Sequence, residues 1–262
     1  MFLLNNLQDI RSCEILDILT LLPKGERLLE IGAGSGLQAR ILAEHGFHVE
    51  AIDIPGRSHR EDPAWPVQEY DGEHIPFPDN HFGIIFSSNV LEHIPHVRSF
   101  QNEIMRVLKT DGIAVHILPT ASWRFYTTLA HYPYLLKILI AYPFRNTGSE
   151  STGLSRSTSE SLLHMSLSQK VKKALLPSRH GEIGTSVSEM YYFSRSRWAA
   201  LFQDAGWTVD IYCSNRLFYT GYGLLGSTLS IPARRRLSRL LGSSCHVFVL
   251  KKNLFLGSDA LG

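Results

Sequence analysis

The sequence predicts an α/β protein with a doubly wound, mostly parallel sheet and helices on both faces. Short apolar runs alternate with segments of helical periodicity over residues 7–119, which is typical of consecutive βαβ units. The first apolar run, at 27–31, stops at a glycine-rich turn, as buried parallel strands often do. The same alternation returns after residue 190, so residues 119–190 form a large helical or loop insertion after the fifth strand.

The composition describes an ordinary globular protein. Of the 262 residues, 44% are apolar and 19% are charged. A formal net charge of +2 gives no overall field that would favour a nucleic-acid partner. Cys13, Cys213 and Cys245 are widely spaced and odd in number, which favours a reducing compartment over a disulfide framework or a zinc site. With no basic region near the N-terminus to indicate a signal peptide, we expect a cytoplasmic protein.

Each element follows from local periodicity and its flanking residues. Before the insertion we expect helices at 7–22, 37–46 and 97–109, and strands at 27–31, 48–53, 83–86 and 113–119, with the sequence TDG as the turn before the last of these. After it we expect helices at 194–206 and 232–241 and strands at 207–214 and 245–252. Residues 145–161, rich in serine, read as a mobile linker.

The glycine-rich turn reads Gly32-Ala33-Gly34-Ser35-Gly36. Its third glycine arrives one residue earlier than in the dinucleotide fingerprint, and no phosphate-binding P-loop pattern is present. Glu30, two positions before the first glycine, would repel a pyrophosphate but favour an ammonium group. Asp53, at the end of the second strand, can accept hydrogen bonds from both hydroxyls of a ribose. These residues favour a ligand with a ribose and a cationic amine but no phosphate, such as S-adenosylmethionine.

Residues 27–119 resemble the class I S-adenosylmethionine-dependent methyltransferases, close to the small-molecule branch sometimes labelled type 11. The matching stretches are LLEIGAGSG, VEAIDI, EYDGEHIPFPDNHFGIIFSSNVLEHI and NEIMRVLKTDGIAVHILP. The resemblance implies a Rossmann-like sheet of seven strands with the last antiparallel. It also implies one domain over 1–262, comprising a cofactor-binding half (1–118), an insertion that forms a substrate lid or cap (119–190) and a completion of the sheet (191–252).

The resemblance also implies roles for individual residues toward S-adenosylmethionine, whose product is S-adenosylhomocysteine. The residues that would hold its methionine end or line that part of the site are Glu30, Gly32, Ala33, Gly34, Gly36, Ser88 and Asn89. Asp53 would bind the ribose, Ile54 and Gly72 would lie near the adenine, and Asp71 would accept from the adenine amino group. The alternative for Asp71 is a carboxylate that stabilises a turn, and the alternative for Asn89 is a helix cap.

Candidate residues for chemistry lie after the strand at 83–86, the fourth in the order that the family resemblance implies, and at the end of the insertion. His93 is the first candidate for a general base, although a structural role is an alternative, and His96 is a weaker candidate. His180, Glu182, Tyr191 and Tyr192 could contact the acceptor, or could belong to a loop that only closes the lid. No cluster of Asp, Glu or Asn in the sequence indicates a metal site, and none is expected.

The apolar stretch 123–144 has three interpretations. It could wall an apolar acceptor site, pack as a cap or a homodimer contact, or dock on a membrane surface together with Lys137 and the basic cluster at 234–239. Its uncharged core is too short to span a bilayer.

The expected function is methyl transfer to a small or lipid-linked acceptor, with oxygen as the preferred atom. The alternatives are a nucleic-acid or protein methyltransferase, a non-catalytic partner subunit that binds S-adenosylmethionine, and, more remotely, a dinucleotide oxidoreductase.

Overall fold

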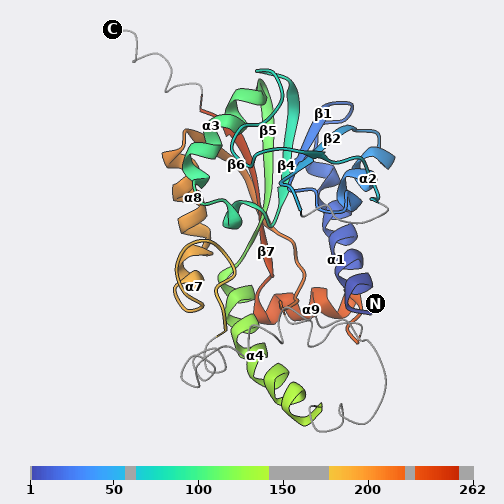
Figure 1. The fold of residues 1–262 in the computed structure, drawn as a ribbon, viewed down its shortest axis with the longest axis vertical. Helices are drawn as coiled ribbons and strands as arrows, with labels where there is room; N and C mark the ends of the chain where they lie inside the picture. The colour runs from blue at the N-terminus through green and yellow to red at the C-terminus, as the bar shows by residue number, and fades with distance from the viewer. Residues whose placement is uncertain (1, 57–62, 142–176, 222–227, 254–262) are drawn as a thin grey trace.

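The structure is a computed structural model that describes residues 2–56, 63–141, 177–221 and 228–253 (Figure 1). Seven strands form one sheet in the order β3-β2-β1-β4-β5-β7-β6. The strands are β1 Arg27–Ile31, β2 His48–Asp53, β3 Gln68–Glu69, β4 Phe82–Ser88, β5 Leu108–Pro119, β6 Trp207–Ser214 and β7 Cys245–Lys252. Every pairing is parallel except those of β7, which is antiparallel to both β5 and β6. The predicted fold class is therefore confirmed, including the antiparallel last strand.

Helices cover both faces of this sheet. The described helices are α1 Phe2–Ile18, α2 Leu37–Glu44, α3 Val97–Val107, α4 Ala121–Ala141, α7 Glu189–Tyr192, α8 Arg195–Asp204 and α9 Ile231–Leu241, with 3-10 turns η1 Leu19–Leu21 and η2 Leu91–His93. Helices α1 and α2 pack together on one side, and α3 and α8 lie on the other (Figure 1). Helices α4 and α9 lie near the end of the sheet at which β5 terminates (Figure 1).

The core is continuous from the parallel strands to the C-terminal hairpin. Phe82 and Phe86 on β4, Phe202 on α8, Trp207 on β6 and Phe248 on β7 are fully buried. The Trp207 indole N–H donates to Gln101 Oε1 at 2.9 Å, so this buried polar group has a partner across the α3–β6 contact.

The predicted TDG turn is wrong, because residues 110–112 belong to β5. The register jumps from Phe82↔Leu108 to Ile84↔Ile113, which leaves the intervening residues of β5 as a bulge. A Cβ on Gly112 would lie 2.9 Å from the carbonyl oxygen of Gly83, so the bulge brings the two backbones together at glycines. A bulge and a turn favour the same residue types, and only strand pairing distinguishes them.

The membrane-like stretch begins inside α4. Trp123 is buried, whereas Phe125, Leu129, Tyr132 and Leu136 are exposed large hydrophobic residues at helical spacing. Among the described helices, none has the length and apolar character needed to cross a bilayer. The three interpretations of this stretch remain predictions, and residues 142–176, including the serine-rich segment 145–161, lie outside the described residues.

The basic cluster on α9 is less available than its sequence suggests. Arg234 is buried and donates to the backbone oxygens of Phe218 and Leu229 at 3.1 and 3.2 Å. Arg235 forms an ion pair with Asp17 of α1 at 2.8 Å. Arg234 therefore serves the fold, Arg235 is engaged in an ion pair at the surface, and Arg236 and Arg239 are the exposed members of the cluster.

Candidate active site

A cavity of about 790 Å³ opens where the parallel strands β1, β2 and β4 end. The strand order reverses between β1 and β4, and ligands of open α/β sheets bind in the crevice at such a point. Of the residues predicted from the sequence, those lining this cavity are Gly32, Gly34, Asp53, Ile54, Asp71, Gly72, Asn89, His93 and His96. The volume lies within the usual range for small-molecule sites.

The glycine loop after β1 needs glycine at two positions for steric reasons. Gly32 and Gly36 have φ of 73° and 72°, in the left-handed region. A Cβ on Gly32 would clash with a methyl carbon of Val90, and one on Gly36 would lie 2.8 Å from the backbone oxygen of Trp65. The loop therefore packs against the segment after β4 and the segment before β3, with no room for side chains.

Asp53 ends β2 beside this loop and is 7% exposed. Its Oδ2 accepts from the Gly34 amide at 2.7 Å, and its Oδ1 accepts from the Ile54 amide at 2.7 Å. A carboxylate offers about four acceptor positions, so Asp53 keeps capacity for further donors from the cavity. This is the arrangement that a vicinal diol, such as that of a ribose, requires.

Asp71 lines the cavity and also stabilises a turn, so both predicted roles are compatible with its position. Its Oδ1 accepts from the amides of His74 and Glu73 at 2.7 and 2.8 Å. These backbone hydrogen bonds, of which the one from His74 has the larger effect, hold the pKa of Asp71 below its usual value, so the carboxylate is ionised at neutral pH. Gly72, with φ of 84°, lets the chain turn beside Ile54.

Glu30 is placed differently from the predicted contact with a cofactor ammonium group. It is 1% exposed and is not among the residues that line the cavity. Burial raises the pKa of Glu30 to about 8, against the opposing effect of a hydrogen bond from the backbone of Ala39 on α2. Direct contact between Glu30 and a ligand therefore remains a prediction, and the backbone hydrogen bond of its side chain is with Ala39 on α2.

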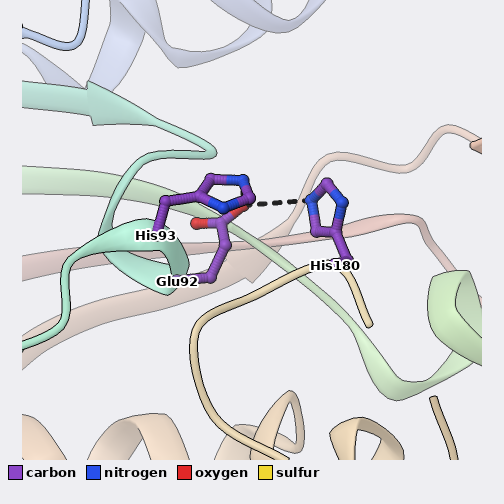
Figure 2. A group of neighbouring side chains, drawn as sticks. All are labelled: Glu92, His93 and His180. Atoms are coloured by element: carbon purple, nitrogen blue, oxygen red, sulfur yellow. Dashed lines mark ion pairs between the residues drawn. The ribbon is translucent and has the colours of Figure 1, made fainter. Parts of the chain in front are cut away.

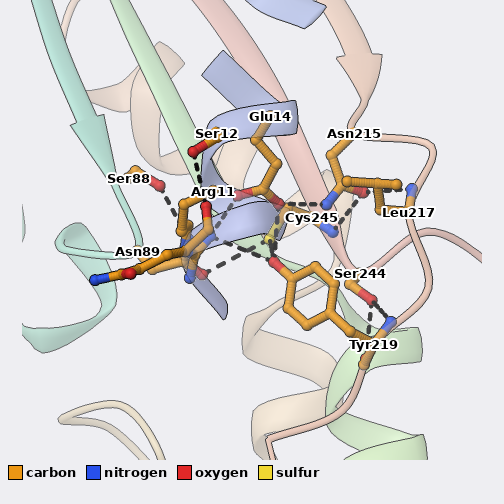
Figure 3. Close-up of polar contacts among 11 residues, drawn as sticks. Arg11, Ser12, Glu14, Ser88, Asn89, Asn215, Leu217, Tyr219, Ser244 and Cys245 are labelled. Carbon is orange, nitrogen blue, oxygen red and sulfur yellow. Dashed lines mark hydrogen bonds and ion pairs between the residues drawn. The ribbon is translucent and has the colours of Figure 1, made fainter. Parts of the chain in front are cut away.

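Asn89 follows β4 and connects the cavity to the N-terminal helix. Its backbone N–H donates to the Ile117 carbonyl at 2.8 Å, and its φ of 55° is unusual for a residue other than glycine. With its side-chain oxygen turned toward α1, Asn89 accepts from two guanidinium nitrogens of Arg11, at 2.7 and 3.1 Å. In the other orientation of the side-chain amide, Asn89 Nδ2 donates to Ser88 Oγ at 3.2 Å. Figure 3 shows Arg11 reaching from α1 toward Asn89.

Arg11 was not among the residues predicted from the sequence. It is anchored by Glu14, whose carboxylate lies 2.6 Å from the guanidinium. Glu14 also accepts from Asn215 Nδ2 and from the Tyr219 hydroxyl, at 2.6 and 2.9 Å (Figure 3). No local motif signals this group, since its members come from opposite ends of the chain.

His93, which lines the cavity, contacts His180 from the loop before α7. Their ring centroids are 4.7 Å apart in an edge-to-face arrangement, and His180 also lies 4.6 Å from the Trp123 ring. Nε2 of His93 and Nε2 of His180 are 3.9 and 3.7 Å from Oε1 of Glu92, which is fully buried (Figure 2). The two histidines were predicted separately, whereas Glu92 was not predicted.

The side chains of the other predicted acceptor residues do not join this group. Glu182 pairs with Arg179 at 3.5 Å on the surface, and Tyr191 is 59% exposed beneath the guanidinium of Arg197. Tyr192 lines a second cavity of about 400 Å³, which shares Ile94, Pro95, His96 and Ser99 with the larger one.

The strand order, the glycine loop and the carboxylate after β2 together define the class of Rossmann-like, S-adenosylmethionine-dependent methyltransferases. The model of a family described as a methyltransferase domain matches residues 7–211, and the chain belongs to this family.

Solved structures share the fold at low sequence identity. A putative methyltransferase of Haloferax volcanii, solved with the methyltransferase activator Trm112, aligns over 95% of this chain and 92% of its own, with 13% identity and a TM-score of 0.54. An S-adenosylmethionine-dependent methyltransferase of Mesorhizobium loti aligns over 92% of this chain and 98% of its own, with 14% identity and a TM-score of 0.52.

Curated relatives match only part of the chain. An uncharacterized methyltransferase of Mycobacterium leprae is 34% identical over 99 residues, 36% of this chain and 37% of the relative. The 2-methyl-6-phytyl-1,4-hydroquinone methyltransferase of Synechocystis is 34% identical over 102 residues, 36% of this chain and 32% of the relative. The chain thus spans about a third of the length of the curated relatives that it matches.

Proposed function

We propose that this protein binds S-adenosylmethionine and transfers its methyl group to a small or lipid-linked acceptor, at oxygen. The observation that carries the cofactor assignment is Asp53, held by the Gly34 and Ile54 amides at the edge of the 790 Å³ cavity with acceptor capacity remaining. The cavity offers the features that this cofactor requires, namely a carboxylate for the ribose, the Ile54 side chain for the adenine and a loop that allows close approach of backbone. When bound, the cofactor supplies a methyl group on a sulfonium, which is an excellent leaving group.

The protein's own contribution is positioning and proton transfer. An in-line displacement requires the acceptor atom to be held in near-attack geometry beside the methyl group. An alcohol or phenol must also lose its proton, and we expect the imidazole of His93, a residue that lines the cavity, to accept it. Asn89, fixed by Arg11, shapes the same wall.

The acceptor class rests on two observations. The second cavity, lined by Ile183, Tyr192 and Trp198 among others, shares part of its lining with the larger one, and it offers an apolar portion of the acceptor a place close to the cofactor. The Synechocystis relative acts on a hydroquinone that carries a phytyl chain, which is an acceptor of this kind.

Calorimetric titration with S-adenosylmethionine and S-adenosylhomocysteine, with NAD as control, tests the cofactor assignment. We expect micromolar binding of the first two and none of NAD. Labelled methyl donor with extracted lipids and small molecules then tests the acceptor class. Binding without methylation of any acceptor fraction would favour a non-catalytic partner subunit, and binding of NAD instead would contradict the proposal.

A further inference from the structure

We propose that Glu92, His93 and His180 form a binding site for a divalent transition metal ion of the Zn²⁺ type. Each of the three residues offers one ligand atom, and these atoms lie within 4.8 Å of one another. Figure 2 shows the His180 side chain, from the loop before α7, facing the two neighbouring residues of η2. Two imidazoles and one carboxylate are a ligand set that Zn²⁺ and related ions use in catalytic sites.

The carboxylate of Glu92 indicates that a cation belongs here. Its side chain is fully buried, yet no described residue donates a hydrogen bond to either of its oxygens. A buried carboxylate without donors is strongly unfavourable, so such groups are paired or coordinate metals. The two imidazoles do not supply that pairing, because their Nε2 atoms stay 3.9 and 3.7 Å from Oε1, beyond hydrogen-bond distance.

The separations suit an ion between the ligands. Two ligand atoms about 2.1 Å from a tetrahedral zinc ion are about 3.4 Å apart. The separations of 3.7 and 3.9 Å from Oε1 to the two imidazole nitrogens therefore need to contract by only a few tenths of an ångström. The third separation, between the ligand atoms of the two imidazoles, is at most 4.8 Å and would close by up to about 1.4 Å when the ion binds.

The loop that carries His180 is fixed in place. The amides of His180 and Gly181 both donate to Glu189 Oε1, at 2.6 and 2.7 Å, and the amide of Glu182 donates to the carbonyl of Glu92 at 2.9 Å. A Cβ on Gly181 would lie 2.8 Å from that same carbonyl oxygen. The loop is therefore tied directly to the backbone of one ligand, as a pre-organised site requires.

The position of the site indicates what the ion would contact. His93 lines the larger cavity and Glu92 lines the smaller one, so the group lies in the wall between them. An ion with a coordination position open to the cavity would bind an acceptor oxygen and favour its deprotonation, so that in the metal-bound protein the ion, and not the His93 imidazole, activates the acceptor. This role rests on the proposed methyl transfer, whereas metal binding itself does not.

Metal binding is tested on the full-length protein after treatment with a chelator. We expect one equivalent of Zn²⁺ to bind by calorimetry, and Co²⁺ to give the visible absorption of a low-symmetry site with imidazole ligands. His180→Ala and Glu92→Gln should each lower the Zn²⁺ affinity at least tenfold. His45→Ala, which removes an exposed histidine at the end of α2, is the matched control and should leave the affinity unchanged.

Thermal unfolding and cofactor titration separate the outcomes. Zn²⁺ should raise the Tm of the wild type and of His45→Ala but not that of Glu92→Gln, which keeps the shape of the side chain. The proposal is overturned if the wild type binds no stoichiometric metal, or if His180→Ala and Glu92→Gln bind it as tightly as the wild type. If neither the wild type nor any of the variants binds S-adenosylmethionine, the proposed function is contradicted, and the result on metal binding is unaffected.

Discussion

At the scale of single residues, two carboxylates that end neighbouring strands have opposite environments. Asp53 ends β2 with two backbone donors and an opening to the cavity. Glu30, the penultimate residue of β1, is buried away from the cavity, and burial raises its pKa to about 8. Asp53 is therefore suited to binding a ligand as an anion. Glu30 is protonated, and so uncharged, up to about pH 8.

Replacing Asp53 with Ala should weaken S-adenosylmethionine binding by about 1–3 kcal/mol, because charge-assisted hydrogen bonds to the ribose are lost. Calorimetric titration measures this effect directly. Asp204→Ala, at an exposed ion pair on α8, serves as the control and should bind as the wild type does. An unchanged affinity in Asp53→Ala would remove Asp53 from the site.

Glu30→Gln should change how the stability of the ligand-free protein depends on pH. The pKa of Glu30 rises from 4.5 to about 8 on folding, so the folded state binds more protons between these values. Its stabilising contribution is therefore complete below about pH 4.5 and is lost as the pH rises through 8. Between pH 5 and 8 the wild type should lose roughly 2–4 kcal/mol more than the variant.

Urea unfolding at a series of pH values measures this difference. Glu44→Gln, at an exposed i,i+4 pair on α2, should follow the wild-type profile. Parallel profiles for the wild type and Glu30→Gln would show that burial does not hold Glu30 in its protonated form.

At the scale of elements, a buried ion pair positions the loop that reaches the site. Arg124 on α4 and Glu189 on α7 are 3.0 Å apart and almost fully buried. Arg124 also donates to the carbonyls of Ser178 and Ser186, while Glu189 accepts from the amides of His180 and Gly181. The pair therefore fixes both ends of the segment that presents His180.

Glu189→Ala should destabilise the protein by about 3–5 kcal/mol, because Arg124 would be left buried without its counter-charge. Urea unfolding measures the loss, and hydrogen exchange at the amides of His180 and Gly181 should accelerate. Glu182→Ala, which breaks an exposed pair in the same loop, should cost less than about 1 kcal/mol. Equal effects of the two variants would show that the buried pair does not hold the loop.

At the scale of the whole molecule, the N-terminal helix joins the first and last thirds of the chain. Glu14 on α1 is 1% exposed and accepts from Arg11, Asn215 and Tyr219. Arg11 in turn reaches Asn89 at the end of β4. Docking of α1 thus connects the stability of the C-terminal hairpin region to the geometry of the cavity.

Removing this connection with Glu14→Ala should cost about 3–5 kcal/mol in unfolding free energy, since a cation and two polar groups lose a buried partner. We also expect weaker cofactor binding, because Arg11 would no longer be held against Asn89. Asp17→Ala, three residues along the same helix, breaks an exposed pair with Arg235 and should change either quantity little. Denaturant unfolding and calorimetry together check both effects.

The sequence by itself determined most of the elements, and it singled out residues from distant segments that line one cavity. Apolar periodicity located six of the seven strands, and the paired spacing of the glycine loop and Asp53 indicated the ligand class. These signals are local, because strand and helix periodicity and tight turns depend on residues close in the chain. Where local signals were ambiguous they failed, as with the β5 bulge that was predicted to be a turn.

Only the tertiary structure decided which distant residues meet. It placed Glu30 away from the cavity, buried Arg234 within a cluster that looked like a basic surface, and brought His180 to Glu92 and Arg11 to Asn89. In the sequence, Glu92 reads as an ordinary acidic residue after a strand. Its carboxylate is buried without hydrogen-bond donors only because η2 packs beneath the loop from the insertion. Contacts of this kind depend on how layers pack across the sheet, and sequence spacing carries no record of that packing.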